Sequence, residues 1–242
     1  MRRLFAAQRT GPVAPTNPHG PYVKPLPTKG AEMTEIRLIE LLCSKLCHDL
    51  VGPVGAIGNG MELLEEEDLG MSKEALDLTA QSTRRASAIL QFYRIAYGLG
   101  QTERRQDPAF LSDLADGILK GTRVSLDWPE AARAQVWPEG SGKLILNMIA
   151  LAQEALPTGG TVQVGITEDS SGAEISATAL GKEAGFNDAT LEALSEGVAL
   201  QQLTPRNVHG YFTMLLSQRV GGRLEISMPA NDTLRLSSKV PV

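Results

Sequence analysis

The chain has 242 residues, of which 42% are hydrophobic and 21% are charged, and its formal net charge at pH 7 is −5. These values are ordinary for a globular protein of one large or two small domains. The negative charge argues against general nucleic-acid binding, because nucleic-acid-binding surfaces are basic. No apolar run approaches the roughly 18 residues that a membrane-spanning helix needs, so we expect no membrane partner.

The N-terminal sequence and the cysteines indicate the compartment. The stretch MRRLFAAQRTGPVAP holds an apolar patch that is too short for a secretory signal. Cys43 and Cys47 lie four residues apart in one helical pattern, where a disulfide would be awkward. Free cysteines are typical of a reducing compartment, so we expect a cytoplasmic protein.

Residues 1–32 hold six of the fourteen prolines and few aliphatic residues. Such a composition cannot bury a core, so we predict a disordered, proline-rich tail. Met33 offers an alternative start of the chain.

Two long amphipathic helices are predicted after this tail. From Thr34, the predicted N-cap, apolar residues recur at steps of three and four until Gly70 breaks the pattern. A second pattern of the same kind ends at Gly98 and Gly100. The predicted apolar stripe comprises Ile39, Cys43, Leu46, Leu50, Val54, Ile57, Met61 and Leu64 in the first helix and Leu76, Thr79, Thr83, Ala86, Leu90, Tyr93 and Tyr97 in the second.

The short connection between the helices predicts an antiparallel hairpin over residues 33–100. Two helices cannot surround a core by themselves, so the wide apolar stripe would stay half exposed. A second copy would complete a four-helix bundle around a two-fold axis, and we therefore expect a homodimer. The alternative is that the hairpin packs on the rest of its own chain.

Residues 101–242 change to a mixed pattern of helices and strands. Asp107-Pro108 is predicted to cap a helix that runs through Leu119. Strands grouped in pairs between helices predict an α/β sandwich with helices on one face of a mixed sheet, so the fold class of the whole chain is α+β. Further helices are predicted at 141–156, 188–195 and 206–220, and strands at 122–128, around 133–137, and at 161–167, 173–179, 223–228 and 233–240. Trp128 and Trp137 are expected to pack in the core.

The stretch LCHDLVGPVGAIGNG, Leu46 to Gly60, interrupts the first helical pattern with a proline and four glycines. Each glycine costs a helix interior about 1 kcal/mol relative to alanine. Pro53 lacks the N–H that would bond the carbonyl of Asp49, so we expect a bend there. A purely structural interpretation is a kinked helix whose glycines allow close packing beside an incidental surface histidine.

His48 is predicted to point outward. At 100° per residue it lies opposite the stripe that holds Leu46 and Leu50, so its side chain should be exposed. Several of its neighbours have small side chains or none, which leaves a shallow clearing that another protein surface can approach. Its neighbours on this face are Ser44, Lys45, Val51, Gly52 and Gly55, three of which are the small residues Ser44, Gly52 and Gly55, with Asn59 further along the same face.

An exposed histidine in such a clearing suits phosphoryl transfer. Neutral imidazole is a good phosphoryl acceptor near pH 7, and the carboxylate of Asp49 could hold or accept the proton of the other ring nitrogen. Lys45, one turn earlier, could contact the phosphoryl oxygens. A metal site formed by Cys43, Cys47 and His48 is a weaker alternative, because Cys43 belongs to the apolar stripe while His48 faces outward.

The segment HDLVGP, residues 48–53, resembles the H-[ED]-x-x-x-P motif of the dimerisation and phosphotransfer helix of sensor histidine kinases. Over residues 34–242, the order of a helical hairpin and an α/β domain is also similar to that family. This resemblance implies that the second domain has the Bergerat fold of the kinases' ATP-binding domain.

The second domain departs from the kinase pattern where ATP would bind. The segment LILNMIALAQEAL, residues 144–156, resembles the N-box with Asn147 at its first asparagine, but Leu151 replaces the second asparagine and Lys143 the preceding acidic residue. The D-x-G-x-G loop is replaced by residues 178–182 and the glycine-rich lid by residues 209–213, where His209 is expected to be structural at a helix start. Each change removes a nucleotide contact, so we expect neither ATP nor another cofactor.

A phosphorylatable histidine on a dimeric bundle, joined to an ATP-domain shell without ATP residues, is similar to the ChpT-type bacterial histidine phosphotransferases. This resemblance implies a phosphorelay intermediate that takes a phosphoryl group from the receiver aspartate of a hybrid histidine kinase and passes it to the receivers of response regulators. The receivers would supply Mg²⁺ and would contact Ser44, Val51, Gly52, Gly55 and Asn59. The alternatives are a non-enzymatic dimeric scaffold or kinase inhibitor, and an autophosphorylating kinase with a divergent nucleotide site.

Overall fold

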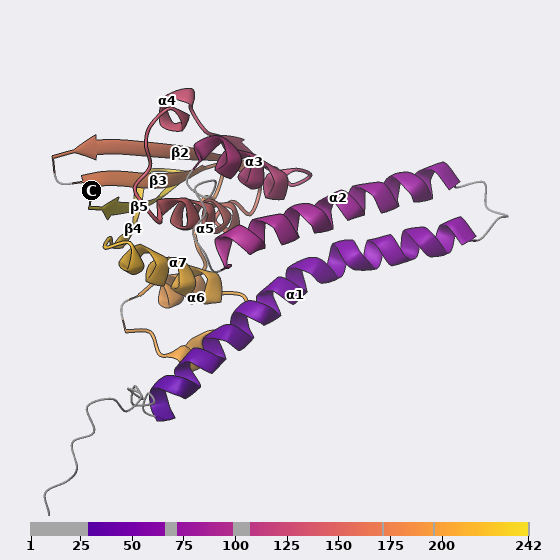
Figure 1. Ribbon diagram of the computed structural model, residues 1–242, viewed down its shortest axis with the longest axis horizontal. Helices are drawn as coiled ribbons and strands as arrows, with labels where there is room; N and C mark the ends of the chain where they lie inside the picture. Colours follow the sequence, from indigo (N-terminus) through magenta and orange to yellow (C-terminus); the bar gives the residue numbers. More distant parts are fainter. Residues whose placement is uncertain (1–28, 66–71, 99–106, 171, 196, 242) are drawn as a thin grey trace, which may run out of the picture.

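The computed structural model describes residues 29–65, 72–98, 107–170, 172–195 and 197–241. The chain forms a long helical hairpin and a second, α/β domain, which confirms the predicted α+β class (Figure 1). Residues 1–28 of the predicted tail, and the predicted helix breakers Gly70 and Gly100, lie outside the described residues. Within the described part, none of the helices combines the length and apolarity that a membrane span requires.

The hairpin consists of α1 (Lys29–Glu65) and α2 (Ser72–Ala96). The first helix begins five residues before the predicted N-cap, Thr34, so residues 29–32 are helical and do not belong to the predicted tail. Pro53 lies inside α1, and Figure 1 shows that α1 changes direction along its length. The connected ends of the two helices project away from the second domain.

The second domain holds one five-stranded sheet in the order β1-β2-β3-β5-β4, in which β1 pairs with β2 in parallel and the other pairs are antiparallel. The strands are β1 (Val124–Asp127), β2 (Gly160–Asp169), β3 (Gly172–Leu180), β4 (Leu224–Ala230) and β5 (Thr233–Val240). The helices are α3 (Pro108–Leu119), α4 (Glu130–Arg133), α5 (Ser141–Glu154), α6 (Asp188–Ala193) and α7 (Val208–Arg219), with a 3₁₀-helix η2 (Leu200–Gln202). The predicted cap of α3 is confirmed, because Asp107 accepts a hydrogen bond from the N–H of Ala109.

The strand predicted around 133–137 is wrong. Residues 130–133 form the short helix α4 behind Pro129, and the chain then turns back so that the indole of Trp137 donates to the carbonyl of Ala132. Val136, which a strand would have used, is 86% exposed. Trp128 and Trp137 are both buried with ring centroids 5.4 Å apart, so their predicted place in the core is confirmed.

The hairpin packs on the second domain at two places. The end of α2 enters the main core with Phe92, Ile95 and Ala96, next to α3 and α5. The first part of α1 contacts α7 and η2, where Leu41 is buried in a separate apolar cluster and Arg37 donates to the carbonyl oxygen of Leu200 at 2.9 Å. Both helices are therefore attached to the second domain near the base of the hairpin.

The stripe that was predicted to be buried remains open in a single chain. Five of its large apolar members are between 48% and 60% exposed, while the others, such as Leu46, Leu50 and Ile57, are partly buried; the exposed ones are Ile39, Val54, Met61, Leu76 and Leu90. The hairpin thus packs on its own chain at its base and exposes an apolar face along its length.

Candidate functional site

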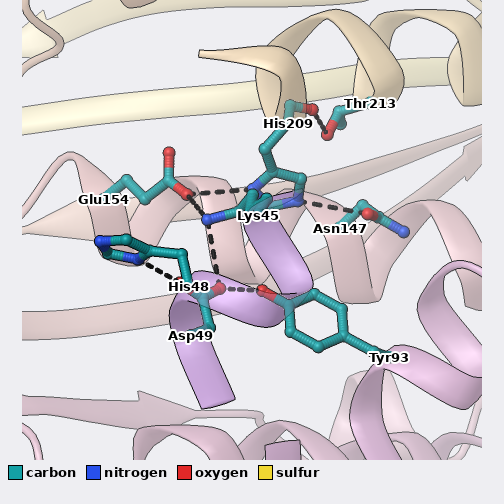
Figure 2. Close-up of polar contacts among 8 residues, drawn as sticks. All are labelled: Lys45, His48, Asp49, Tyr93, Asn147, Glu154, His209 and Thr213. Atoms are coloured by element: carbon teal, nitrogen blue, oxygen red, sulfur yellow. Dashed lines mark hydrogen bonds and ion pairs between the residues drawn. The ribbon is translucent and has the colours of Figure 1, made fainter. Parts of the chain in front are cut away.

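His48 lies on α1 with 82% of its side chain exposed, as the helical periodicity predicted. Its Nδ1 is 3.3 Å from Oδ1 of Asp49, the next residue in the helix. An ionised carboxylate can only accept, so Nδ1 carries the proton and donates it to Asp49. Figure 2 shows Nε2 on the far side of the ring, where its lone pair is directed away from Asp49.

The second oxygen of Asp49 is held from two other positions. Oδ2 accepts a hydrogen bond from the hydroxyl of Tyr93 on α2 and lies 3.4 Å from Nζ of Lys45 (Figure 2). Partial burial alone would raise the pKa of Asp49, but the hydrogen bond from Tyr93 and the charge of Lys45 outweigh it and hold this pKa below its usual value. Asp49 is therefore ionised near neutral pH, and its two oxygens serve different partners.

Lys45 does not stand on the exposed face where the helical periodicity placed it. Only 13% of its side chain is exposed, and Nζ lies 3.2 Å from Oε1 of Glu154 at the end of α5 as well as near Asp49. Burial would lower the pKa of Lys45, but the two carboxylates raise it above its usual value. The ammonium group of Lys45 therefore bridges the hairpin and the second domain. Its predicted contact with phosphoryl oxygens stays a prediction.

Glu154 continues this chain of polar contacts into the second domain. Its Oε1 lies 3.2 Å from Nδ1 of His209, and Nε2 of His209 lies 3.2 Å from Oδ1 of Asn147 (Figure 2). His209 is buried at the start of α7, in agreement with the structural role that the sequence predicted. Burial would raise the pKa of Glu154, but His209 and Lys45 lower it below its usual value.

Asn147, the residue in the N-box position, has its whole side chain occupied by the protein. Its Nδ2 donates to the carbonyl oxygen of Ala96 at 3.0 Å and to that of Lys143 at 2.8 Å, while Oδ1 faces His209. Lys143 itself donates to the carbonyl oxygens of Tyr97 and Gly98, at the end of the hairpin. Residues that resemble a nucleotide-binding wall therefore fasten α2 to the second domain.

Against the residues that the structure describes, the glycines around His48 have no packing role. A Cβ added to Gly52, Gly55 or Gly58 would meet nothing within 4 Å, whereas one added to Gly60 would collide with the side chain of Thr79. Only the last glycine of the stretch is thus needed for the approach of α2. The structural interpretation, in which the glycines allow close packing, holds for Gly60 alone.

The predicted partner-binding residues share the exposed face of α1. All of them are exposed: Ser44, Val51, Gly52, Gly55 and Asn59. A cavity of about 460 Å³ opens beside this face, between the hairpin and the second domain, and its lining includes Asp49, Tyr93 and Glu154. His48 therefore stands above the junction of the two domains.

The sequence did not predict the roles of Tyr93 and Glu154. Tyr93 was assigned to the apolar stripe because its spacing fits, and Glu154 lies within the segment that resembles the N-box. Their partners are 44 and 55 residues away in the chain, as the Tyr93–Asp49 and His209–Glu154 pairs show. No local spacing could have indicated these contacts.

Comparisons with known proteins agree with this geometry. Residues 110–232 match the family model of the Histidine phosphotransferase C-terminal domain. The chain is 33% identical over 201 residues to the Protein phosphotransferase ChpT of Brucella abortus (strain 2308), a match that covers 83% of this chain and 94% of that protein. It also resembles a solved structure of a bacterial phosphotransferase, with 30% identity, a TM-score of 0.71, and coverage of 84% of this chain and 96% of the other.

Proposed function

Because the chain belongs to the ChpT-type histidine phosphotransferases, we propose that His48 is the phosphoacceptor of a phosphorelay. It accepts a phosphoryl group from the receiver aspartate of a hybrid histidine kinase and passes it to the receivers of response regulators. The observation that carries this proposal is the exposed imidazole, whose Nδ1 is held by Asp49 and whose surroundings are cleared by glycines without neighbours.

The arrangement of His48 and Asp49 suits in-line transfer. The lone pair of Nε2 forms the N–P bond while the bond between phosphorus and the receiver's carboxylate oxygen breaks, and the aspartate leaves as a carboxylate. The proton stays on Nδ1, so the ring gains positive charge that the ionised Asp49 stabilises. The same steps in reverse pass the phosphoryl group to the next receiver.

We propose that the receiver supplies the Mg²⁺ ion for this step. Mg²⁺ prefers free carboxylates and phosphate oxygens as ligands. The two carboxylates described near His48 are engaged, Asp49 by Tyr93 and Lys45, and Glu154 by Lys45 and His209. The donor set on this chain therefore fits a phosphoacceptor better than a metal ligand.

The engaged side chains of the second domain support transfer without ATP. The amide of Asn147, which would have to contact a nucleotide-bound metal, is buried and hydrogen-bonded on all sides. Leu151 is buried in the core at the position of the second N-box asparagine. These contacts disfavour the alternative of an autophosphorylating kinase.

We also propose that the protein acts as a homodimer. The exposed apolar stripe runs along both helices and includes Val54, Met61 and Leu90. Burying such a stripe against its copy removes apolar surface from water at roughly 25 cal/mol per Å². A four-helix bundle formed in this way would keep both His48 side chains on its outer faces, because His48 lies on the opposite side of α1 from this stripe.

Transfer from a phosphorylated receiver domain tests the proposal. Wild-type protein and His19→Gln should acquire the label, whereas His48→Gln should not, because of the two histidines in the described part of the chain, His48 is exposed beside an orienting carboxylate and His209 is buried. Label that persists on His48→Gln would refute the assignment. Label acquired from ATP alone would establish the kinase alternative, and partner regulation that survives in unlabelled His48→Gln would establish the scaffold.

A further inference from the structure

The hydroxyl of Tyr93, on α2, donates a hydrogen bond to the carboxylate of Asp49. Tyr93 and His48 lie on opposite sides of this carboxylate (Figure 2). We propose that Tyr93 is a positioning residue for phosphoryl transfer: by holding Oδ2 of Asp49, it keeps Oδ1 on Nδ1 of His48 and leaves Nε2 as the nucleophile. This inference rests on the proposed function of His48.

The need for such a residue follows from the freedom of a carboxylate. Asp49 can rotate about its Cβ–Cγ bond, and terminal torsions of this kind are broad. Without Tyr93, Oδ2 would retain Lys45 at 3.4 Å, and that ammonium group is shared with Glu154 at 3.2 Å. The Tyr93 hydroxyl, unlike the Lys45 ammonium group, donates to Asp49 and not also to Glu154. It therefore fixes which oxygen of Asp49 faces His48.

The tautomer of His48 depends on this orientation. A neutral imidazole has one N–H and one lone pair, and the nitrogen that donates to a carboxylate keeps the proton. His48 is 82% exposed, so water alone does not hold its proton on Nδ1, and the contact of 3.3 Å with Asp49 is what selects Nδ1–H. If the Asp49 carboxylate rotated freely, part of the His48 population would carry its proton on Nε2. A proton on Nε2 blocks the attack of this nitrogen on phosphorus.

The second domain in turn holds Tyr93 in place. The Tyr93 ring packs edge-on against Phe92, its neighbour in α2 that is buried in the main core, with ring centroids 5.7 Å apart, and it is tilted against Tyr97, with ring centroids 4.6 Å apart. One turn further on, Asn147 binds the carbonyl oxygen of Ala96 and Lys143 binds that of Tyr97. The end of α2 is thus anchored to α5, and through Tyr93 this anchorage reaches the phosphoacceptor.

The ionisation of the pair is consistent with this role. Burial, together with the nearby Tyr97 and Asp49, raises the pKa of Tyr93 above its usual value, so its hydroxyl keeps its proton at all physiological pH values. The pKa of Asp49 is lowered, so the carboxylate remains an acceptor. The charged groups around the pair are Lys45 on α1, Arg85 on α2 and Glu154 on α5.

Tyr93→Phe removes the hydroxyl and keeps the ring, and Tyr97→Phe is its matched control. The hydroxyl of Tyr97 is buried one turn away, beside Tyr93, and among the described contacts it makes no hydrogen bond to Asp49. The chain has only three histidines, so full-length protein labelled with ¹⁵N-histidine gives three pairs of ring signals, which His48→Gln and His209→Gln assign. Nitrogen shifts then report the tautomer of His48 without any phosphorylation.

We expect His48 to be protonated on Nδ1 in wild type and in Tyr97→Phe, and to become a mixture of tautomers in Tyr93→Phe. Transfer from a phosphorylated receiver should be about tenfold slower in Tyr93→Phe, the effect of losing one hydrogen bond to a charged group, and unchanged in Tyr97→Phe. Unfolding curves should show that both variants are fully folded under the assay conditions, so that a difference in transfer rate does not come from unfolding.

Two results would overturn the inference. The first is an unchanged His48 tautomer and transfer rate in Tyr93→Phe. The second is an equal loss of rate in both tyrosine variants with no change of tautomer, which would make the effect one of packing. If wild type accepts no phosphoryl group at all, the proposed function fails, and the tautomer measurement still decides separately whether Tyr93 orients the Asp49–His48 pair.

Discussion

Replacing Gly55 by alanine should make the protein more stable and worse at phosphoryl transfer. Gly55 lies on α1 seven residues after His48, which places it about 20° around the helix from His48 and about 10.5 Å along the axis. A Cβ at this position meets nothing within 4 Å, so the chain itself has room for the methyl group. The substitution therefore separates helix stability from the use of the open surface.

The expected magnitude follows from helix propensity. Alanine is favoured over glycine by about 1 kcal/mol in a helix interior, and no described contact of Gly55 opposes this gain. Gly52 would give a less clear result, because a Cβ directly before Pro53 crowds the proline ring in a helical conformation. We expect the free energy of unfolding of Gly55→Ala to rise by about 1 kcal/mol, measured by urea denaturation at a fixed protein concentration.

The phosphotransfer assay should show the opposite trend. A methyl group on the face of His48 keeps a docked receiver from its closest approach, and misplacing reacting groups by about 1 Å can slow a reaction up to a hundredfold, so we expect a loss of about tenfold. Gly58→Ala is the matched control. Its Cβ is equally free of neighbours, but it lies about 80° around the helix from His48, so it should gain the same stability and transfer normally.

A stabilised Gly55→Ala that transfers as fast as wild type would refute the idea that the glycines serve docking. A destabilised Gly55→Ala would show instead that α1 needs this glycine for its own shape.

Two further outcomes follow from the exposed stripe and from the polar chain. We expect light scattering to show a monomer for Leu90→Glu, on the exposed part of α2, and the proposed dimer for Val136→Glu, at a more exposed site outside the stripe; a dimeric Leu90→Glu would count against the proposed bundle. Glu154→Gln should be less stable than wild type at pH 7, because the lowered pKa of Glu154 means that its ionised form stabilises the fold. This contribution is lost as the pH falls below about 4.3, the usual glutamate pKa, so the free energies of unfolding of the two proteins should converge in acid. A difference between them that is constant with pH would contradict this reasoning.

The exposure of His48 could be predicted because it depends on one helix only. Its direction follows from α1 and from the spacing to Leu46 and Leu50, which α1 retains despite Pro53. The position of Lys45 could not be predicted in the same way. It is on the same helix, but its burial depends on Glu154, more than one hundred residues later, and on the docking of the second domain against that side of α1.

Two of the errors of the sequence prediction, the strand at 133–137 and the role of Tyr93, have a common cause. The segment at 133–137 was read as a strand from its composition, but the contact of Trp137 with Ala132 folds it back on itself. Tyr93 was read as an apolar residue from its spacing, but its ring and its hydroxyl have different partners, Phe92 and Asp49. In both cases an aromatic residue has a polar atom whose partner only the tertiary structure supplies.

The two attachments of the hairpin bear on why a phosphotransferase would keep an ATP-domain shell. A kinase that phosphorylates its own histidine has to bring a bound nucleotide to it, which requires its two domains to move relative to each other. Here Arg37 binds the carbonyl oxygen of Leu200 at one end of the junction, and Asn147 binds that of Ala96 at the other, so such movement would break both hydrogen bonds. A histidine that is loaded and unloaded by other proteins needs no such movement. It needs a surface of constant shape on both sides of His48, and a second domain held rigidly against α1 and α2 provides one.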